Sequence, residues 1–528
     1  MKRFNRVLAL MLALVLVLSF ASFTGAQDER VLVIGHAEST DFLDPQRGFT
    51  QTTSIIRRAT YDTLTTFPAQ DASEVLPRLA TSWEVSEDGT AYTFTLREDV
   101  TFVSGNPLTA EDVVFTIERL QNVQGNPAFL ADNIESVVAN EDGTVTFNLV
   151  AGRPSFLAEL ANTAFSIVDA ETVIANGGSS AEDAAETDTA DQYLNNTSAG
   201  TGPYILESWT PQDETVMVKN PNFWGEEAYF DRVIIVNIPE AATQQIALEA
   251  GDIDMALDMT RDQTDALAGN PDIVVESGQS VYTHFILMNQ DSEIGGIVSD
   301  PTVQLAVRYA LDYDGYKALW GGATPPTNLF IGLAGSYGED QAFTRDLDRS
   351  RELLAEAGYP DGFDITLNYP DFTWQGVNMN TNAQKIQADL AEVGINVTLQ
   401  PGELQVSLEE YRNGDQGFAY WFWGPDVLDP LDVLSFLPGG KVATERTNWD
   451  PAMVGDEELL ALIEQAATET DTETRLEVFA ALQDKLQESG PFAPFNVPAL
   501  QTAHLADIEG YFYHPQWTLD IAILTRAE

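Results

Sequence analysis

The chain contains no cysteine among its 528 residues. Disulfide bonds are therefore excluded, and a stable fold must come from a hydrophobic core. Cysteine is also the residue that carries the lipid anchor of many exported bacterial proteins, so we expect no tether of that kind. A chain of this length is expected to form two or three domains with ample buried surface.

Basic residues are scarce. The chain has 26 lysines and arginines against 82 aspartates and glutamates, which gives a formal net charge of −56. Such acidity excludes a general attraction to nucleic acid or to anionic membrane surfaces. It favours solubility, and it is compatible with a saline medium, because salt screens the repulsion between like charges.

Long hydrophobic runs are absent beyond the N-terminus. There, basic residues precede an uncharged run over 7–20, which is shorter than the roughly 20 residues that span a bilayer. Small residues follow, so we predict a secretory signal peptide at 1–26, cleaved after Ala26 or after Ala21; an uncleaved anchor is the alternative. The mature protein is expected to be exported and soluble, in the periplasm or another extracytoplasmic space.

Motifs of common enzymes are also absent. The sequence has no Gly-x-Ser-x-Gly elbow, no His-Glu-x-x-His pair and no phosphate-binding loop. Its four histidines are scattered, which predicts no metal site and no cofactor. We therefore expect a protein that is not an enzyme, with a hydrolase or an acidic exported structural protein as the rival interpretations.

Several local patterns predict secondary structure in the first half. Asp-Gly turns at 88–89 and 142–143 are each followed by alternating apolar residues, which predicts two β-hairpins. Thr109 is expected to cap a helix. The stretch 177–200 is rich in Gly, Ser, Ala, Asp and Thr, and we expect a solvated loop or a weak helix there, with no site.

The second half alternates between strand and helix patterns. The expected strands lie at 364–369, 395–399 and 418–423, and the expected helices at 349–357 and 383–393. This order indicates an α/β architecture with a parallel or mixed sheet covered by helices.

The most informative segment is 420–430, which reads Tyr-Trp-Phe-Trp-Gly-Pro-Asp-Val-Leu-Asp-Pro. Successive side chains of a strand point to opposite faces, so Tyr420 and Phe422 are expected to face one way and the two tryptophans the other. One face can pack into a core while the other offers an indole beside the Asp426 carboxylate to a small ligand with an amine or polar end. A buried strand followed by a solvated turn is the alternative.

An ordered series of short blocks resembles one family of proteins. The blocks are Leu-Asp-Pro at 43–45, Leu-Pro-Arg-Leu-Ala-Thr-Ser-Trp at 76–83, Ser-Glu-Asp-Gly at 86–89, Thr-Ala-Glu-Asp-Val-Val-Phe at 109–115, Gly-Thr-Gly-Pro-Tyr at 200–204, Asn-Pro-Asn-Phe-Trp-Gly at 220–225, Leu-Glu-Ala-Gly-Asp-Ile-Asp at 248–254 and Val-Arg-Tyr-Ala-Leu-Asp at 307–312. They are similar to the extracellular solute-binding proteins of ABC importers in family 5, which includes dipeptide-, oligopeptide- and nickel-binding proteins.

The resemblance implies a two-lobed α/β fold of the periplasmic-binding-protein type (type II, cluster C) with an additional inserted domain. The lobes of this family close around a ligand by a hinge motion. The expected division is lobe I at 27–59, 196–284 and 491–528, an inserted domain at 60–195, and lobe II at 285–490. The chain is expected to cross between lobes near residues 287–289 and 492–494.

The resemblance also implies a binding site. The segment 423–430 is similar to the binding segment of the peptide-binding members: Trp, two residues, Asp, two residues, Asp-Pro. Carried over, this makes Asp426 the partner of a ligand ammonium and Trp423 a wall of the cleft, with Gly424 beside it. Asp429, which precedes a proline, is expected to set the turn.

Two departures from the family leave the ligand open. Phe422 stands where relatives have glycine, and Tyr420 stands near where oligopeptide binders carry an arginine for the ligand carboxylate. Arg412 is the nearest basic residue and a candidate for that role, with a solvated surface position as the alternative. A peptide is the expected ligand and an oligosaccharide the alternative. The expected partner of this monomer is a membrane permease with its ATPase subunits.

Overall fold

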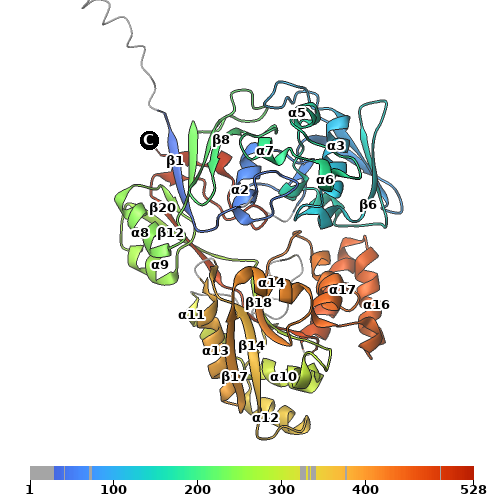
Figure 1. Cartoon of the computed structure of the whole chain (residues 1–528), viewed down its shortest axis with the longest axis vertical. Helices are drawn as coiled ribbons and strands as arrows, with labels where there is room; N and C mark the ends of the chain where they lie inside the picture. The colour runs from blue at the N-terminus through green and yellow to red at the C-terminus, as the bar shows by residue number, and fades with distance from the viewer. Residues whose placement is uncertain are drawn as a thin grey trace, which may run out of the picture.

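The computed structural model describes residues 29–40, 42–70, 74–320, 329–330, 333, 341–374, 377–487 and 489–527. The predicted signal peptide at 1–26 lies outside the described residues. Figure 1 shows two groups of elements, with β1, β8 and β6 in the upper part of the view and β14, β17 and β18 in the lower part. Within the described ranges, no helix combines the length and the apolar character needed to cross a membrane.

The first sheet has seven strands in the order β12-β20-β11-β1-β10-β9-β8. β1 runs parallel to β10 and β11, and the other pairs are antiparallel. The helix α8 ends at Gly251, whose φ of 74° suits a residue without a Cβ. The strands and helices are β1 (Val31–His36), β8 (Tyr204–Thr210), β9 (Glu214–Lys219), β10 (Arg232–Asn237), β11 (Met255–Ala256), β12 (Ile273–Gln279), β20 (Ala499–Leu505), α2 (Gln51–Thr60), α8 (Ala241–Ala250) and α9 (Arg261–Leu267).

The second sheet has five strands in the order β17-β14-β18-β13-β19. β14 runs parallel to β17 and β18, whereas β13 is antiparallel to β18 and β19, so the predicted mixed sheet is confirmed. Its elements are β13 (Thr283–Met288), β14 (Phe363–Pro370), β17 (Ile395–Gly402), β18 (Phe418–Trp423), β19 (Phe492–Asn496), α10 (Pro301–Ala310), α11 (Tyr313–Leu319), α12 (Leu347–Glu356), α13 (Met379–Ala391), α14 (Leu404–Arg412), α15 (Lys441–Thr447), α16 (Glu457–Thr468) and α17 (Thr472–Gln487).

Both faces of the second sheet are covered. Apolar residues of α10 to α13 pack on one face, in a core that includes Tyr420. Residues of α14 to α17 pack on the opposite face, in a second core that includes Trp421. The central strands β13 and β18 are therefore buried on both faces, as expected where helices flank a sheet, whereas β17 at the edge keeps exposed residues.

The third sheet is antiparallel, with four strands in the order β4-β5-β7-β6. The two predicted hairpins are confirmed, and their turn residues Gly89 and Gly143 have positive φ values of 67° and 82°. The helix α3 begins after Thr109, whose main-chain N–H donates to Asp112 over 2.9 Å. The elements are β4 (Ala80–Val85), β5 (Ala91–Leu96), β6 (Ile134–Ala139), β7 (Val145–Leu149), α3 (Ala110–Asn122), α4 (Phe156–Glu159), α5 (Ala170–Ala175), α6 (Ala184–Thr187) and α7 (Asp191–Leu194).

Short elements complete the fold. Two-residue strands pair as β2 with β3, β15 with β16 and β21 with β22. Their bounds are β2 (Thr65–Thr66), β3 (Leu76–Pro77), β15 (Thr373–Trp374), β16 (Val377–Asn378), β21 (Ile508–Glu509) and β22 (Thr525–Arg526). A 3-10 helix, η5 (Pro430–Phe436), follows Asp429, whose carboxylate accepts from the Leu431 N–H over 2.9 Å, as a turn-setting residue would.

The chain passes twice between the first and second sheets. β12 pairs with β20 in the first sheet, and β13 pairs with β19 in the second, so the connections are residues 280–282 and 497–498. These positions differ by a few residues from the expected crossings at 287–289 and 492–494. The difference arises because β13 is buried along its whole length and belongs entirely to the second sheet.

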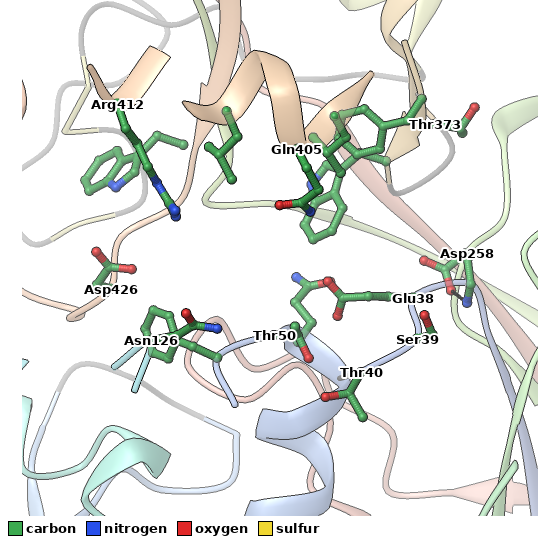
Figure 2. A pocket seen from close by; sticks show the side chains of 18 of the residues that line it. Glu38, Ser39, Thr40, Thr50, Asn126, Asp258, Thr373, Gln405, Arg412 and Asp426 are labelled. Carbon is green, nitrogen blue, oxygen red and sulfur yellow. Dashed lines mark hydrogen bonds between the residues drawn. The ribbon is translucent and has the colours of Figure 1, made fainter. Parts of the chain in front are cut away.

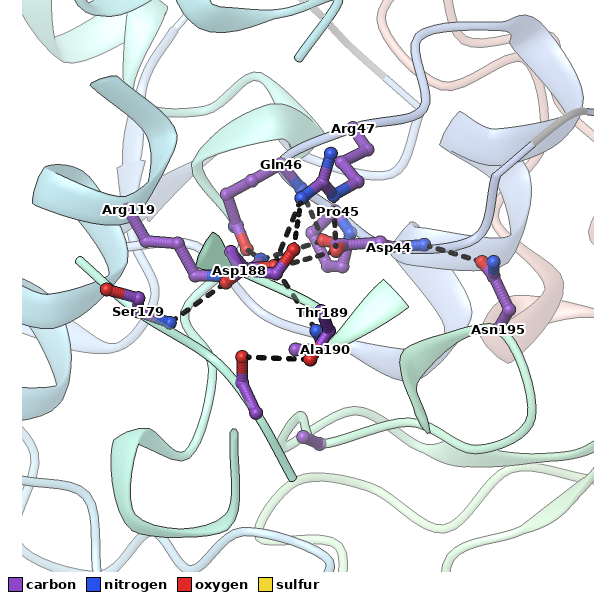
Figure 3. A network of polar contacts seen from close by, with 12 residues as sticks. Asp44, Pro45, Gln46, Arg47, Arg119, Ser179, Asp188, Thr189, Ala190 and Asn195 are labelled. Atoms are coloured by element: carbon purple, nitrogen blue, oxygen red, sulfur yellow. Dashed lines mark hydrogen bonds and ion pairs between the residues drawn. The ribbon is translucent and has the colours of Figure 1, made fainter. Parts of the chain in front are cut away.

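A buried charge network joins the segment after β1 to the domain of the third sheet. Arg119 of α3 is fully buried and donates to both oxygens of Asp44, over 2.8 and 2.6 Å, and to both oxygens of Asp188, over 2.8 and 2.9 Å (Figure 3). Asp188 lies in the stretch 177–200, so the expectation of a purely solvated segment there is wrong at this residue. Its burial depends on Arg119, which is remote in sequence.

We predict that Arg119→Gln destabilises the protein by about 3–5 kcal/mol, because two buried carboxylates lose their shared counter-ion. Urea unfolding followed by circular dichroism measures this loss. The matched control is Arg349→Gln on α12, where an exposed pair with Glu352 is worth less than about 1 kcal/mol. Equal unfolding midpoints for the two variants would contradict the assignment of Arg119 as a structural centre.

Candidate functional site

A cleft of about 1790 Å³ lies between the first and second sheets, and the domain of the third sheet contributes to its wall. The first-sheet side supplies segments near Glu38 and Asp258, the third-sheet domain supplies residues 124–132, and the second-sheet side supplies α14, α15 and the end of β18. Figure 2 shows polar side chains that enter this space from opposite walls. Because sites for drug-sized molecules are usually about 300–1,000 Å³, the cleft has room for a larger ligand with water.

The predicted site residue Tyr420 does not line the cleft. Its side chain is fully buried, and its hydroxyl lies 2.5 Å from His284 Nδ1 and accepts from Asn382 Nδ2 over 2.8 Å. This corrects the expectation that the aromatic run opens one of its faces to the ligand. Helices cover both faces of β18, so Trp421 is also a core residue, and only the carboxyl end of the strand reaches the cleft.

Phe422 and Gly424 lie behind the wall. The Phe422 ring stacks on Trp374, which does line the cleft, at a centroid distance of 5.2 Å and an interplanar angle of 27°. Gly424 leaves room for the Tyr282 ring, since a Cβ on Gly424 would lie 2.4 Å from that ring. Tyr282 in turn accepts a hydrogen bond from Gln51 over 2.7 Å. Both predicted residues thus support the aromatic wall.

Trp423 and Asp426 line the cleft as the sequence predicts. The half-buried Trp423 packs against Phe436 at a centroid distance of 4.6 Å. Asp426 follows on the turn after β18, and its main-chain N–H donates to Asp432 Oδ2 over 2.8 Å. Burial raises the pKa of Asp426 to about 6, a rise that the positive charge of Arg446 limits. The carboxylate is therefore partly desolvated and lacks a full counter-ion.

Arg412 also lines the cleft, from the last turn of α14. The residue is still exposed, as the surface alternative expected, but partial desolvation and the nearby Arg446 lower its pKa. Figure 2 shows Arg412 and Asp426 near each other on one side of the cleft. Arg446 of α15 lines the same wall, and the sequence analysis missed it. No local pattern distinguishes Arg446 from other arginines, because only the packing of α15 against α14 brings it to the cleft.

Comparisons with known proteins identify the family of the chain. Residues 74–444 match the model of the bacterial extracellular solute-binding proteins, family 5. The chain belongs to this family. It is 26% identical over 530 residues to the probable D,D-dipeptide-binding periplasmic protein of Escherichia coli K12, with 98% of each chain covered. It is 28% identical over 456 residues to heme-binding protein A of Haemophilus influenzae, with 80% of this chain and 79% of the relative covered.

Solved structures give the same result for the fold. The periplasmic binding protein DppA of Helicobacter pylori, solved in complex with the peptide STSA, superposes with a TM-score of 0.79 at 25% identity and covers 95% of this chain and 99% of its own. The names of the relatives include a peptide ligand and a heme ligand. Family membership therefore leaves the ligand of this solute-binding protein to be inferred from the chemistry of its own cleft.

The opposite wall of this solute-binding protein carries acids that the sequence analysis missed. Glu38 accepts from the Thr52 N–H over 2.9 Å, and burial raises its pKa. Asp258 lies 2.6 Å from His36 Nδ1; although burial opposes ionisation, His36 lowers the pKa of Asp258. These residues are far apart in sequence and meet only through the parallel pairing of β1 with β11. In the described ranges, no group of three or more histidines and acids is placed to hold a metal ion.

We predict that Gly424→Ala destabilises this solute-binding protein by about 1–3 kcal/mol, because the new methyl group collides with the buried face of Tyr282. Thermal unfolding at several urea concentrations measures the change. Gly269→Ala is the matched control, since nothing lies within 4 Å of a Cβ there. If both substitutions have the same effect, the close approach of Tyr282 does not constrain the site.

Proposed function

We propose that this solute-binding protein captures peptides in its cleft and delivers them to the membrane permease of an ABC importer, whose ATPase subunits drive transport. The observation that carries the peptide assignment is Asp426, a partly desolvated carboxylate beside the Trp423 indole at the end of β18. A peptide ammonium would form a charge-assisted hydrogen bond with this carboxylate and compensate the cost of its burial. The solute is proposed to leave the protein chemically unchanged.

Hinge closure would place the ligand between the two large sheets, with the connections at 280–282 and 497–498 as the hinge. Contacts next to Asp426 support this: the Asn162 side chain donates to the Asp426 carbonyl over 2.7 Å. Val427 packs with Phe67 and Trp517, which belong to other parts of the chain. We propose that these contacts form in the closed state, so that ligand binding and closure favour each other.

The remaining sequence predictions are part of the same proposal. The first, third and second sheets would correspond to lobe I, the inserted domain and lobe II, with the boundaries between the lobes at the connections 280–282 and 497–498. The protein would act as an exported monomer. Native mass spectrometry of the protein as purified, with identification of the released solute, tests both the oligomeric state and the ligand class. Release of an oligosaccharide in place of a peptide would contradict the peptide assignment.

We predict that Asp426→Asn weakens peptide binding by about 1.5–3 kcal/mol, because the ammonium loses a charged partner. Isothermal titration calorimetry with trialanine and N-acetyl-trialanine measures the effect. Acetylation should weaken binding to the wild type but cause little further loss in Asp426→Asn. Asp348→Asn, on an exposed side chain of α12, is the control. Unchanged affinity in Asp426→Asn would indicate a neutral ligand.

The pH dependence of binding provides an independent prediction. With a pKa of about 6, the Asp426 carboxyl is ionised above pH 6. Below pH 6 it is mostly protonated and must lose its proton before it can bind an ammonium. Affinity should therefore be highest between about pH 6 and 8 and fall up to about tenfold per unit below pH 6; above pH 8 the ligand amine loses its proton. Two neighbours move the pH at which affinity falls. The positive charge of Arg446 lowers the pKa of Asp426 and moves this pH down, whereas repulsion from the Asp432 carboxylate moves it up. Calorimetry from pH 4.5 to 9 tests the profile, and Asp426→Asn should lack its acidic limb.

A further inference from the structure

Two arginines of the cleft have no acidic partner. In a chain with 82 acids and 26 bases, most described arginines form an ion pair, as Arg119 and Arg475 do. Arg308 is buried and donates to main-chain carbonyls. Arg412 and Arg446 line the cleft, and neither has a carboxylate within ion-pair distance among the described residues. In so acidic a protein, two unpaired guanidinium groups on one wall indicate a site for an anion.

Arg446 is held in place by an aromatic stack. Its guanidinium lies over the Tyr411 ring, 4.5 Å from the centroid. Tyr411 stacks on Trp421 at a centroid distance of 4.6 Å and an angle of 19°, and the Trp421 indole donates to Gln416 over 2.7 Å. Tyr411 and Trp421 are both buried. The guanidinium is therefore positioned before a ligand arrives, which lowers the entropy cost of binding.

Arg412 and Arg446 repel each other across the same region. Burial and the charge of Arg446 together lower the pKa of Arg412. Arg446 also acts on Asp426, so the two arginines and this carboxylate form one electrostatic unit. An isolated ammonium bound to Asp426 would experience the positive charge of Arg446. A ligand that brings an ammonium together with a carboxylate would instead place opposite charges next to each other.

We propose that Arg412 and Arg446 bind a carboxylate carried by the first residue of the peptide, next to the ammonium held by Asp426. This inference rests on the proposed function and adds a preference for peptides with a carboxylate on their first residue. Two kinds of peptide present such a carboxylate: those that begin with an acidic side chain, and those whose first glutamate is linked through its γ-carboxyl and keeps its α-carboxylate free. The planar guanidinium groups can take either carboxylate with two parallel hydrogen bonds.

The test compares charged and neutral ligands on matched proteins by calorimetry at 0.15 M salt. The ligands are Glu-Ala-Ala, γ-Glu-Ala-Ala, Gln-Ala-Ala and C-terminally amidated Gln-Ala-Ala. The proteins are the wild type, Arg412→Gln, Arg446→Gln, Arg446→Lys and the control Arg349→Gln on α12. Circular dichroism melts establish that each variant is folded.

The wild type should bind one or both glutamate peptides at least about tenfold more tightly than Gln-Ala-Ala. Arg412→Gln and Arg446→Gln should each reduce that preference to about threefold or less. Because Arg446 also acts on Asp426, the readout is the ratio of the glutamate and glutamine affinities within each variant. Arg446→Lys should retain part of the preference, and Arg349→Gln all of it. Comparison of Glu-Ala-Ala with γ-Glu-Ala-Ala identifies whether the side-chain carboxylate or the α-carboxylate binds to the two arginines.

Three outcomes separate the inference from the function on which it rests. Equal wild-type affinity for the glutamate and glutamine peptides overturns the carboxylate subsite and leaves peptide binding intact. A second outcome is that C-terminal amidation weakens binding to the wild type but not to the arginine variants. This result would assign the arginines to the C-terminal carboxylate of the ligand and would also overturn the proposed subsite. Absence of binding by every peptide overturns the proposed function together with the inference.

Discussion

The burial of β18 on both faces decides where this protein can bind a solute. Helices α10 to α13 cover one face and α14 to α17 the other, so no side chain in the middle of the strand meets solvent. Only the carboxyl end of the strand and the turn that follows are free to form a site, as is general for sheets flanked by helices. Trp423 and Asp426 occupy that position, and the residues before them support it.

The second organising factor is the distribution of charge. The chain is strongly acidic, yet the second-sheet wall of the cleft carries Arg412 and Arg446, while the first-sheet wall carries Glu38 and Asp258. The two walls thus present opposite charges to a ligand between them. Because the cleft is partly desolvated, these charges interact more strongly than on the open surface. Asp426 and Glu445 also line the second-sheet wall, and Asp426, whose pKa burial raises, is the carboxylate proposed to bind an ammonium.

Ligand binding and closure of the cleft are proposed to be linked through Asp426 and the next residue, Val427. Asp426 offers its carboxylate to the cleft while its carbonyl accepts a hydrogen bond from Asn162, and Val427 packs against Phe67 and Trp517. A ligand that fixes the Asp426 turn would therefore also stabilise contacts between parts of the chain that separate on opening. The buried network around Arg119 joins the segment after β1 to the domain of the third sheet, so we propose that motion is concentrated at the two connections between the large sheets.

The sequence by itself determined the local elements and the family, because hairpin turns, the Thr109 cap and the motif blocks are encoded by neighbouring residues. It also predicted three residues that line the cleft, Arg412, Trp423 and Asp426. Only the tertiary structure decided which side chains are buried. It placed Tyr420 in a core, used Asp188 in a buried network, and brought Arg446 and Glu38 to the cleft. Burial and proximity depend on helices and strands that are distant in sequence, and no local pattern carries that information.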